Sequence, residues 1–390
     1  MNEERDARPA AVSAASPRVT WEEEGQPRTA RWRSESGAPA PRRIVIADDR
    51  MSADEAWRLA CEGTALLWRG DFHNARQLLQ AIGRRIGRKP AQRKGAAPLT
   101  PADSFHRHRM AQAQRARTLG MLLVPLDAGY RLPLRRAPDV REACTEAWGV
   151  EGEDCLVSLR EILGLIGAHE WRRNGVPVAV LDARIHPHYG VFSPVRGEYL
   201  DLVATAPLPG TDLAFDIGTG TGVLAALLAR RGVARVIATD LDPRALACAR
   251  DNLDRLGLAH QVGLLAADLF PEGRADLVVC NPPWLPGRPT TSLDAAIYDP
   301  DSRMLRGFLD GLAEHLTPRG EGWLVLSDLA EHLGLRSRET LLGWIAAAGL
   351  KVLGRDEVAP RHPKSRDADD PLHEARKAER TSLWRLAADD

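Results

Sequence analysis

The chain has 390 residues and a mass of 42.7 kDa, which is enough for about two to three domains. Lys and Arg total 53, as do Asp and Glu, so the overall charge of zero gives no reason to expect a polyanionic partner. The five cysteines form no Cys-x-x-Cys pair, which argues against a disulfide framework and a cysteine-based zinc site. No apolar run is long enough to cross a membrane. We therefore expect a soluble, cytoplasmic protein that binds no metal and no membrane.

The first half of the chain changes character twice. Residues 1–42 are rich in Ala, Pro, Arg and Ser without a hydrophobic period, which predicts a disordered tail. Residues 43–172 carry apolar side chains at helical spacing, with Ser52 as a candidate helix cap and a helix expected over 154–171, so a mainly helical domain is predicted. The period then shortens, and a hairpin with a connecting segment is expected over 173–212.

Strand and helix patterns alternate from residue 213 to residue 390. Strands are predicted at 213–217, 234–239, 262–267, 275–280, 322–327, 351–358 and 381–387, with helices at 222–231, 243–256, 302–316 and 337–348. Such alternation specifies a mostly parallel sheet covered by helices on both faces. The two last strands have no helix between them, which predicts an antiparallel edge.

A glycine loop follows the first of these strands. Gly218, Gly220 and Gly222 permit a tight turn and let backbone N–H groups approach a ligand. The spacing departs from the Gly-x-Gly-x-x-Gly loop of nicotinamide-binding proteins, because Val223 stands at the position where the third glycine of that loop would follow. We assign Asp216, in the strand before the loop, to the same ligand site. A plain strand-to-helix turn is the alternative interpretation.

Acidic residues end the next two strands. Asp240 ends the second strand, where its carboxylate can accept hydrogen bonds from both ribose hydroxyls of a bound adenosine. Asp268 and Leu269 end the third strand, where the Asp268 carboxylate can accept a hydrogen bond from the amine of adenine. Asp242 is interpreted differently, as the cap of the helix that begins at Pro243.

The fourth strand leads into the tetrad Asn281-Pro282-Pro283-Trp284. The two prolines fix the backbone and remove two N–H donors. The side-chain oxygen of Asn281 and the carbonyl of Pro282 can then accept both protons of one NH2 group and orient its nitrogen. Trp284 offers a face for stacking a base or an amide, with Pro283 as a further substrate contact. A rigid turn with a core tryptophan is the simpler alternative.

Taken together, these motifs resemble those of class I S-adenosylmethionine-dependent methyltransferases over residues 213–330. The tetrad resembles that of members which methylate nitrogen in a planar system. The resemblance implies a Rossmann-like sheet of seven strands with a reversed last strand, and S-adenosylmethionine as cofactor. It places the three glycines at the methionine part of the cofactor, Asp240 at ribose and Asp268 at adenine, and it makes the region 43–172 a substrate-recognition domain.

Two branches of this family share features with the chain. The segment 291–296 resembles small-domain ribosomal-RNA guanine-N2 methyltransferases. The run Arg196-Gly-Glu198 before the glycine loop, and Tyr298-Asp-Pro300, resemble release-factor glutamine methyltransferases. Both branches usually carry Tyr or Phe where this chain has Trp284. We expect Arg196 and Glu198 to contact cofactor or substrate, with a surface ion pair as the alternative.

A local charge asymmetry separates the candidate substrates. Between Arg84 and Arg117 the sequence has ten Lys or Arg and a single acid, Asp103. Such a stretch can neutralise phosphates, so it favours RNA or a ribosomal subunit as partner; a solvated basic face is the alternative. We predict methylation of an exocyclic amino group of a base in RNA. The first alternative is a glutamine amide of a release factor or ribosomal protein, and the second is a small molecule or a non-catalytic cofactor-binding module.

Overall fold

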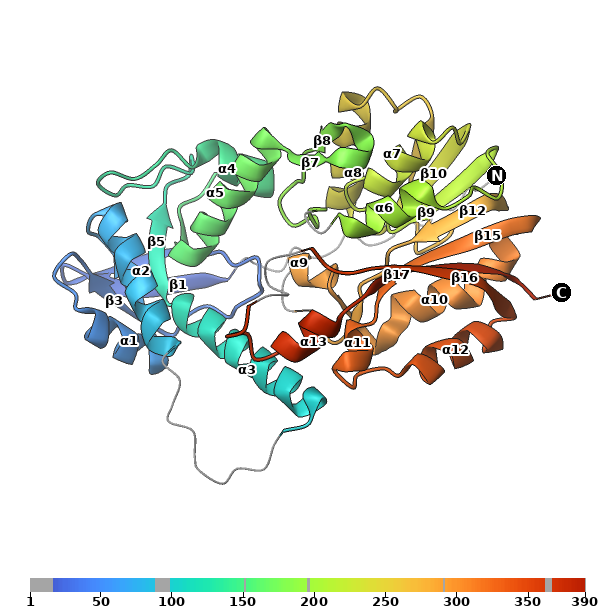
Figure 1. The fold of residues 1–390 in the computed structure, drawn as a ribbon. Coiled ribbons are helices and arrows are strands. Elements are labelled where there is room, and N and C mark those ends of the chain that lie inside the picture. The colour runs from blue at the N-terminus through green and yellow to red at the C-terminus, as the bar shows by residue number, and fades with distance from the viewer. Residues whose placement is uncertain are drawn as a thin grey trace, which may run out of the picture.

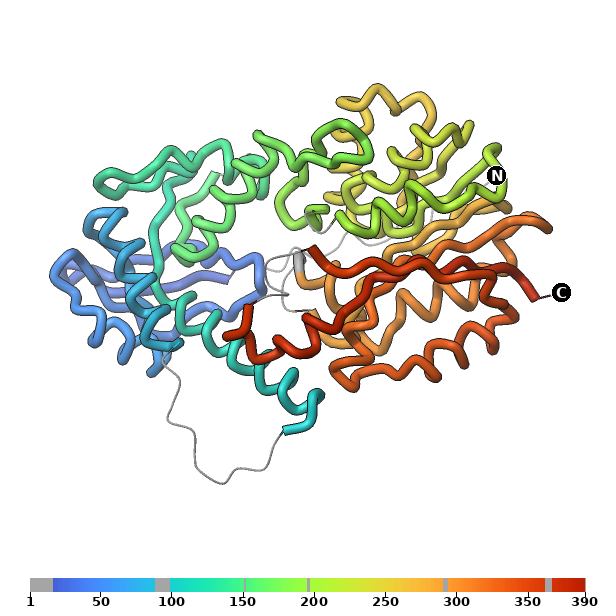
Figure 2. Tube along the Cα trace, viewed as in Figure 1, coloured from blue at the N-terminus to red at the C-terminus, as the bar shows by residue number. Residues whose placement is uncertain are grey.

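Two large sheets with helices packed against them make up most of the described part of the protein (Figure 1). The structure is a computed structural model that describes residues 17–87, 99–150, 152–194, 197–289, 292–361 and 367–389. The tube in Figure 2 shows that the blue-to-cyan half of the chain builds one body and that the yellow-to-red half builds the other. A short antiparallel hairpin, β7 (Val176–Val178) with β8 (Ala183–Ile185), and helix α6 (Glu198–Thr205) connect them. This confirms the predicted hairpin.

Residues 18–32 are folded, so the predicted disordered tail is wrong over this range. Strand β1 (Arg18–Glu23) pairs antiparallel with β2 (Gln26–Trp32). Val19, Ala30 and Trp32 are buried against the inner strands of the first sheet. The apolar side chains recur at every second position of the two strands, between charged and polar neighbours, so no helical period is present. A strand with one buried face requires an apolar side chain only at every second position. The inner strands of the sheet contribute the other residues of the shared core.

The region 43–172 is an α/β body: helices hold most of its regular residues, as predicted, but it also contains four strands, which the prediction of a mainly helical domain missed. Its six-stranded sheet has the order β1-β2-β6-β5-β4-β3. The remaining elements are β3 (Arg43–Ala47), α1 (Ala53–Cys61), β4 (Thr64–Trp68), α2 (Phe72–Ile86), α3 (Pro101–Leu119), β5 (Leu122–Leu126), α4 (Arg141–Trp148), β6 (Cys155–Ser158) and α5 (Leu159–Asn174). Every residue of β4 and of β6 is buried. A short strand buried on both faces is a continuous apolar run, which sequence periodicity does not separate from a helix.

The second sheet has seven strands in the order β11-β10-β9-β12-β15-β17-β16. All neighbours are parallel except β17, which runs antiparallel to both β15 and β16. Its strands are β9 (Leu213–Ile217), β10 (Arg235–Asp240), β11 (Val262–Ala266), β12 (Ala275–Cys280), β15 (Leu316–Ser327), β16 (Leu350–Val358) and β17 (Thr381–Ala388). The predicted Rossmann-like sheet with a reversed last strand is therefore confirmed.

Helices cover both faces of this sheet. On one face, α6 and α7 (Val223–Arg230), with part of α8 (Pro243–Arg255), pack on alternate side chains of β9, β10 and β12. On the other face, α10 (Arg303–Leu312) and α12 (Arg338–Ala347) pack on the intervening side chains. Both faces of the central strands are consequently apolar, and the polar residues collect where the strands end.

Candidate active site at the carboxyl edge of the second sheet

The register of the central strands brings the predicted site residues to one edge. Ile217, the last residue of β9, lies opposite Thr239 of β10 and Cys280 of β12. The residues that follow these three positions are Gly218, Asp240 and Asn281. Because parallel strands end on the same side of a sheet, the glycine loop, the acid and the tetrad are neighbours.

The glycine loop adopts a backbone conformation that is unfavourable for residues with a side chain. Gly218, Gly220 and Gly222 all have positive φ angles, of 71°, 55° and 80°. A Cβ on Gly218 would lie 2.5 Å from the terminal methyl group of Met304, and one on Gly222 would lie 3.2 Å from Ala249 of α8. Gly220 instead faces open space. The loop therefore needs glycine for its conformation, and at Gly220 it leaves room for a ligand.

Asp216 holds this loop in place. Its side chain is fully buried, and its Oδ2 accepts hydrogen bonds from the Thr219 hydroxyl (2.6 Å) and from the Ala225 backbone N–H (3.1 Å). Burial raises the pKa of the carboxyl group to about 6. The second oxygen, Oδ1, is buried and has no hydrogen-bond partner within the described part of the chain. One acceptor thus stays available next to the glycine loop.

Asp240 links the loop to the second strand. Its Oδ2 accepts a hydrogen bond from the Gly220 N–H at 3.0 Å, and its Oδ1 accepts one from the Asp242 N–H at 2.9 Å. Burial raises the pKa of this carboxyl group, and each oxygen retains a further lone pair. The next residue, Leu241, is 60% exposed and adds an apolar surface. Asp242 caps α8 by accepting from the Arg244 N–H at 2.9 Å, which confirms its predicted role.

Asp268 and Leu269 lie beyond the end of β11, near α10. The exposed Asp268 carboxylate pairs with Arg303 at 2.5 Å. Leu269 has a positive φ of 74°, and its carbonyl accepts a hydrogen bond from the Thr239 hydroxyl at 2.6 Å. A Cβ on Gly307 would lie 2.7 Å from the Leu269 side chain. Leu269 therefore fixes this loop against β10 and α10, and Asp268 stays the predicted adenine contact.

The carboxamide of Asn281 is held on two sides. The indole N–H of Trp284 donates to its Oδ1 at 2.9 Å. Its side chain also hydrogen-bonds the hydroxyl of Tyr199, a buried residue of α6 whose pKa burial raises. Pro282 is buried and Pro283 is half-buried behind them. Sequence analysis missed Tyr199, because no local pattern relates it to a residue 82 positions later.

Comparison with known proteins decides the family of this body. Residues 182–338 match the family model described as the methyltransferase small domain. This part of the chain is a methyltransferase domain. The resemblance inferred from the motifs is thereby confirmed.

Curated relatives of the methyltransferase domain include enzymes named for protein substrates. The release factor glutamine methyltransferase of Cereibacter sphaeroides is 35% identical over 170 residues, covering 40% of this chain and 58% of that protein. The ribosomal protein L11 methyltransferase of Pelotomaculum thermopropionicum is 49% identical over 69 residues, covering 17% of this chain and 22% of that protein. The chain thus spans less than two thirds of the length of these relatives. A solved ribosomal protein L11 methylase from Lactobacillus delbrueckii subsp. bulgaricus aligns at 16% identity with a TM-score of 0.36, covering 50% of this chain and 79% of that one.

The residues at the carboxyl edge fit S-adenosylmethionine. The buried Asp216 Oδ1 is an acceptor that lacks a donor among the described residues, which suits an ammonium group. Asp240 keeps lone pairs for ribose hydroxyls, and Leu241 offers an apolar surface for a purine ring. Gly220 leaves open space where any other residue would project a side chain.

Helix α3 of the first body contacts the methyltransferase domain beside the tetrad. Phe105 is buried in a cluster with Leu285, which directly follows the tetrad. The guanidinium of Arg109 lies 3.7 Å from the centre of the Tyr298 ring and donates to the Arg288 carbonyl at 2.7 Å. Arg109 belongs to the predicted phosphate-binding stretch, but here it stabilises the packing of the two bodies.

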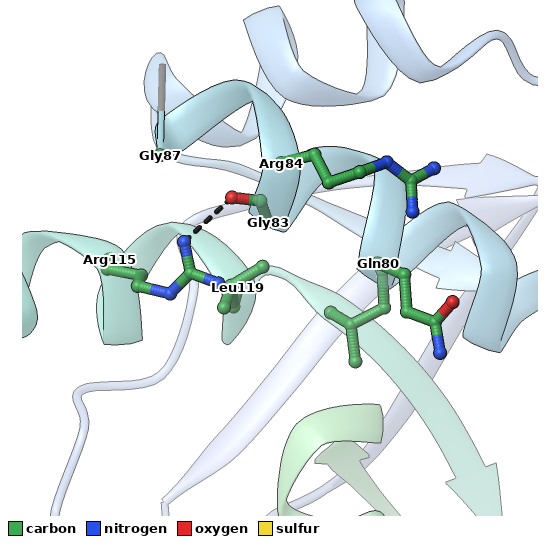
Figure 3. A pocket seen from close by; sticks show the side chains of 7 residues that line it. Gln80, Gly83, Arg84, Gly87, Arg115 and Leu119 are labelled. Atoms are coloured by element: carbon green, nitrogen blue, oxygen red, sulfur yellow. Dashed lines mark hydrogen bonds between the residues drawn. The ribbon is translucent and has the colours of Figure 1, made fainter. Parts of the chain in front are cut away.

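Other cations of the basic stretch also form contacts with residues of this chain. Arg85 pairs with Asp54 at 2.6 Å. Arg115 donates to the Gly83 carbonyl at 2.7 Å, across the groove of about 670 Å³ between α2 and α3 that Figure 3 shows. Arg84 lines the same groove and is exposed. The exposed cations of the described stretch are Arg84, Arg107 and Arg117. The cations at 88, 89, 93 and 94 lie outside the described residues.

Two further predictions concern the segment before the glycine loop and metal binding. Arg196 lies outside the described residues. Glu198 begins α6 and is only 4% exposed, so its carboxylate lies inside the protein. Within the described ranges, no three His, Cys, Asp or Glu side chains gather as metal ligands. None of the described helices has the length and apolar character needed to cross a bilayer.

Proposed function

We propose that the chain is an S-adenosylmethionine-dependent N-methyltransferase that modifies an exocyclic amino group of a base in RNA. The observation that carries the proposal is the Asn281 carboxamide, which is held by Trp284 and Tyr199 beside a glycine loop and a ribose-binding acid. When bound, the cofactor supplies a methyl group activated by a positively charged sulfur. The residues that would bind S-adenosylmethionine are those of the glycine loop, together with Asp216, Asp240 and Asp268.

The tetrad acts by orientation. The Asn281 Oδ1 already accepts one hydrogen bond from Trp284, which leaves a second lone pair for a substrate proton. The Pro282 carbonyl is the other acceptor. Two acceptors that hold both protons of one NH2 group leave the nitrogen lone pair free of hydrogen bonds. The bond to Tyr199 matters because a carboxamide that can rotate offers its oxygen for only part of the time.

Exposed arginines on α2 and α3 favour RNA as the substrate. Arg84, Arg107 and Arg117 are exposed, and α3 packs through Phe105 against Leu285, the residue that follows the tetrad. A phosphate backbone lying along these helices would therefore lead toward the acceptor edge. The second candidate is a glutamine amide in a release factor or ribosomal protein, which the names of the relatives favour. For either substrate we propose a cytoplasmic location.

A labelling experiment separates these candidates. The protein is incubated with tritiated S-adenosylmethionine and, in separate reactions, with ribosomal RNA, intact ribosomal subunits and release factors. The proposal predicts label in RNA for wild type and little label for Asn281→Ala. Label only in protein would select the second candidate. Cofactor binding without transfer to any of these substrates would mean a binding module and would overturn the proposal.

A further inference from the structure

A buried arginine that forms no ion pair with any described residue lies behind the tetrad. Arg336 is 6% exposed, and its Nε has no hydrogen-bond partner among the described residues. Within the described ranges its guanidinium makes one hydrogen bond, a long one of 3.5 Å from Nη2 to the Trp284 carbonyl. Burial lowers the pKa of the guanidinium. A buried cation in this state is costly, so a group that binds it from outside the described chain would stabilise it.

The two acids whose charges act on Arg336, Glu331 and Asp299, already have other partners. Glu331 accepts a hydrogen bond from Arg338 at 2.7 Å. Asp299 accepts from the backbone N–H groups of Met304 and Leu305, both at 3.0 Å, at the start of α10. These carboxylates act on Arg336 only through the longer-range field. No described carboxylate lies within ion-pair distance of its guanidinium.

Arg336 lines a pocket of about 340 Å³ together with Pro286, Asp301, Ser302, Ser337 and Thr340. This volume is within the usual range of small-molecule sites. Ser337 is the cap of α12, so the positive end of a ten-residue helix adjoins the pocket. Asp301 and Ser302 both have a φ of 54°, a conformation that is unfavourable for non-glycine residues and that often accompanies functional sites. Ser302 makes no side-chain cap to α10, although it stands at the cap position.

This pocket adjoins the acceptor site. Pro286 is two residues beyond Trp284, and β13 (Leu285–Pro286) pairs with β14 (Tyr298–Asp299), which leads into Asp301. The lining combines a cation and hydroxyl groups with one acid, the exposed Asp301. A simple anion would use only the cation and the hydroxyls. A nucleotide uses both kinds of group, because its phosphate accepts hydrogen bonds and its sugar hydroxyls donate them.

We propose that this pocket binds the phosphate attached to the nucleotide whose base is methylated, with Arg336 as the phosphate-binding residue. The inference rests on the proposed function, and it identifies a nucleotide rather than a peptide as the substrate of that site. The Arg336 guanidinium and the α12 N-terminus bind the phosphate, and Asp301 accepts a hydrogen bond from a sugar hydroxyl.

Calorimetry with matched ligands tests the pocket. Guanosine 5′-monophosphate and guanosine, and the corresponding adenosine pair, are titrated into the protein saturated with S-adenosylmethionine. Wild type should bind one of the monophosphates at least about tenfold more tightly than its nucleoside, as expected for a charge-assisted contact. Arg336→Met should abolish this difference and leave cofactor affinity unchanged. Arg338→Met is the matched control, because Arg338 is engaged by Glu331, and it should keep the difference.

Several results would overturn the assignment. Equal binding of nucleotide and nucleoside by wild type, with cofactor affinity intact, would remove the phosphate site and leave the proposed function standing. Failure to bind the cofactor would refute the proposed function instead. Tighter binding of an acidic glutamine-containing peptide, lost in Arg336→Met, would assign the pocket to a protein substrate. If Arg336→Met does not fold, Thr340→Val must lower the monophosphate preference of wild type, and an unchanged preference contradicts the proposal.

Discussion

Replacing Asp240 by alanine should weaken cofactor binding strongly. The carboxylate is partly buried, and each of its oxygens accepts one backbone hydrogen bond, from Gly220 and from Asp242, so it is fixed in position before any ligand arrives. Hydrogen bonds to a charged group contribute about 1.5 to 3 kcal/mol each. With two ribose hydroxyls as donors and a partial offset from the solvation of the free carboxylate, we expect a loss of about 3 kcal/mol. That loss is about a hundredfold in the dissociation constant.

Isothermal titration with S-adenosylmethionine measures this effect. Asp242→Asn is the matched control, because Asp242 is the neighbouring acid but serves as a helix cap, and asparagine caps a helix equally well. Its dissociation constant should equal that of wild type. The Gly220 amide loses its acceptor in Asp240→Ala, so circular dichroism must first show that the variant is folded. Equal affinity of a folded Asp240→Ala and wild type would refute the assignment of the second-strand acid to the cofactor.

Three further predictions follow from the buried contacts. Trp284→Phe removes the N–H donor to Asn281 and should lower kcat about three- to tenfold, the value of one net hydrogen bond, at unchanged cofactor affinity; an unchanged kcat would contradict it. Asp216→Asn should be more stable than wild type without cofactor at pH 8, by up to about 3 kcal/mol in urea unfolding, and identical pH profiles would contradict it. Trp32→Ala should cost about 3 to 5 kcal/mol of unfolding free energy, and no change would mean that the first hairpin is not part of the fold.

The pH dependence of the Asp216 prediction has a definite sign. The folded-state pKa of Asp216 is raised from 3.8 to about 6, so folding favours its protonated form. The contribution of the protonated Asp216 carboxyl group to the free energy of unfolding is fully present below pH 3.8 and is lost as the pH rises through about 6. The difference between Asp216→Asn and wild type should therefore appear between pH 4 and pH 6 and stay constant above that range.

Secondary structure can be predicted from this sequence where an element is amphipathic or ends in a recognisable turn. The second sheet alternates strand and helix, and its site residues stand at strand ends, so topology alone brings Asp240 and Asn281 together. The first sheet is harder to predict. Its strand β4 is an uninterrupted apolar run, and its hairpin contributes only every second side chain to the core.

Contacts between distant parts of the chain account for the remaining differences. Arg109 stands in a run of cations, and only the fold shows that its partner is the Tyr298 ring. Tyr199 and Arg336 carry no motif, yet the fold places both against the tetrad. Such roles depend on tertiary packing, and a single sequence does not encode them in any local pattern.

Transfer of a deuterated methyl group to RNA is the decisive test of N-methylation by this protein. Ribosomal RNA is incubated with the protein and S-adenosylmethionine carrying a trideuterated methyl group, then digested to nucleosides and analysed by mass spectrometry. We expect label on the exocyclic nitrogen of one base with wild type, and little label with Asn281→Ala, although that variant still binds the cofactor. Label on carbon or oxygen, or undiminished label with Asn281→Ala, would contradict it.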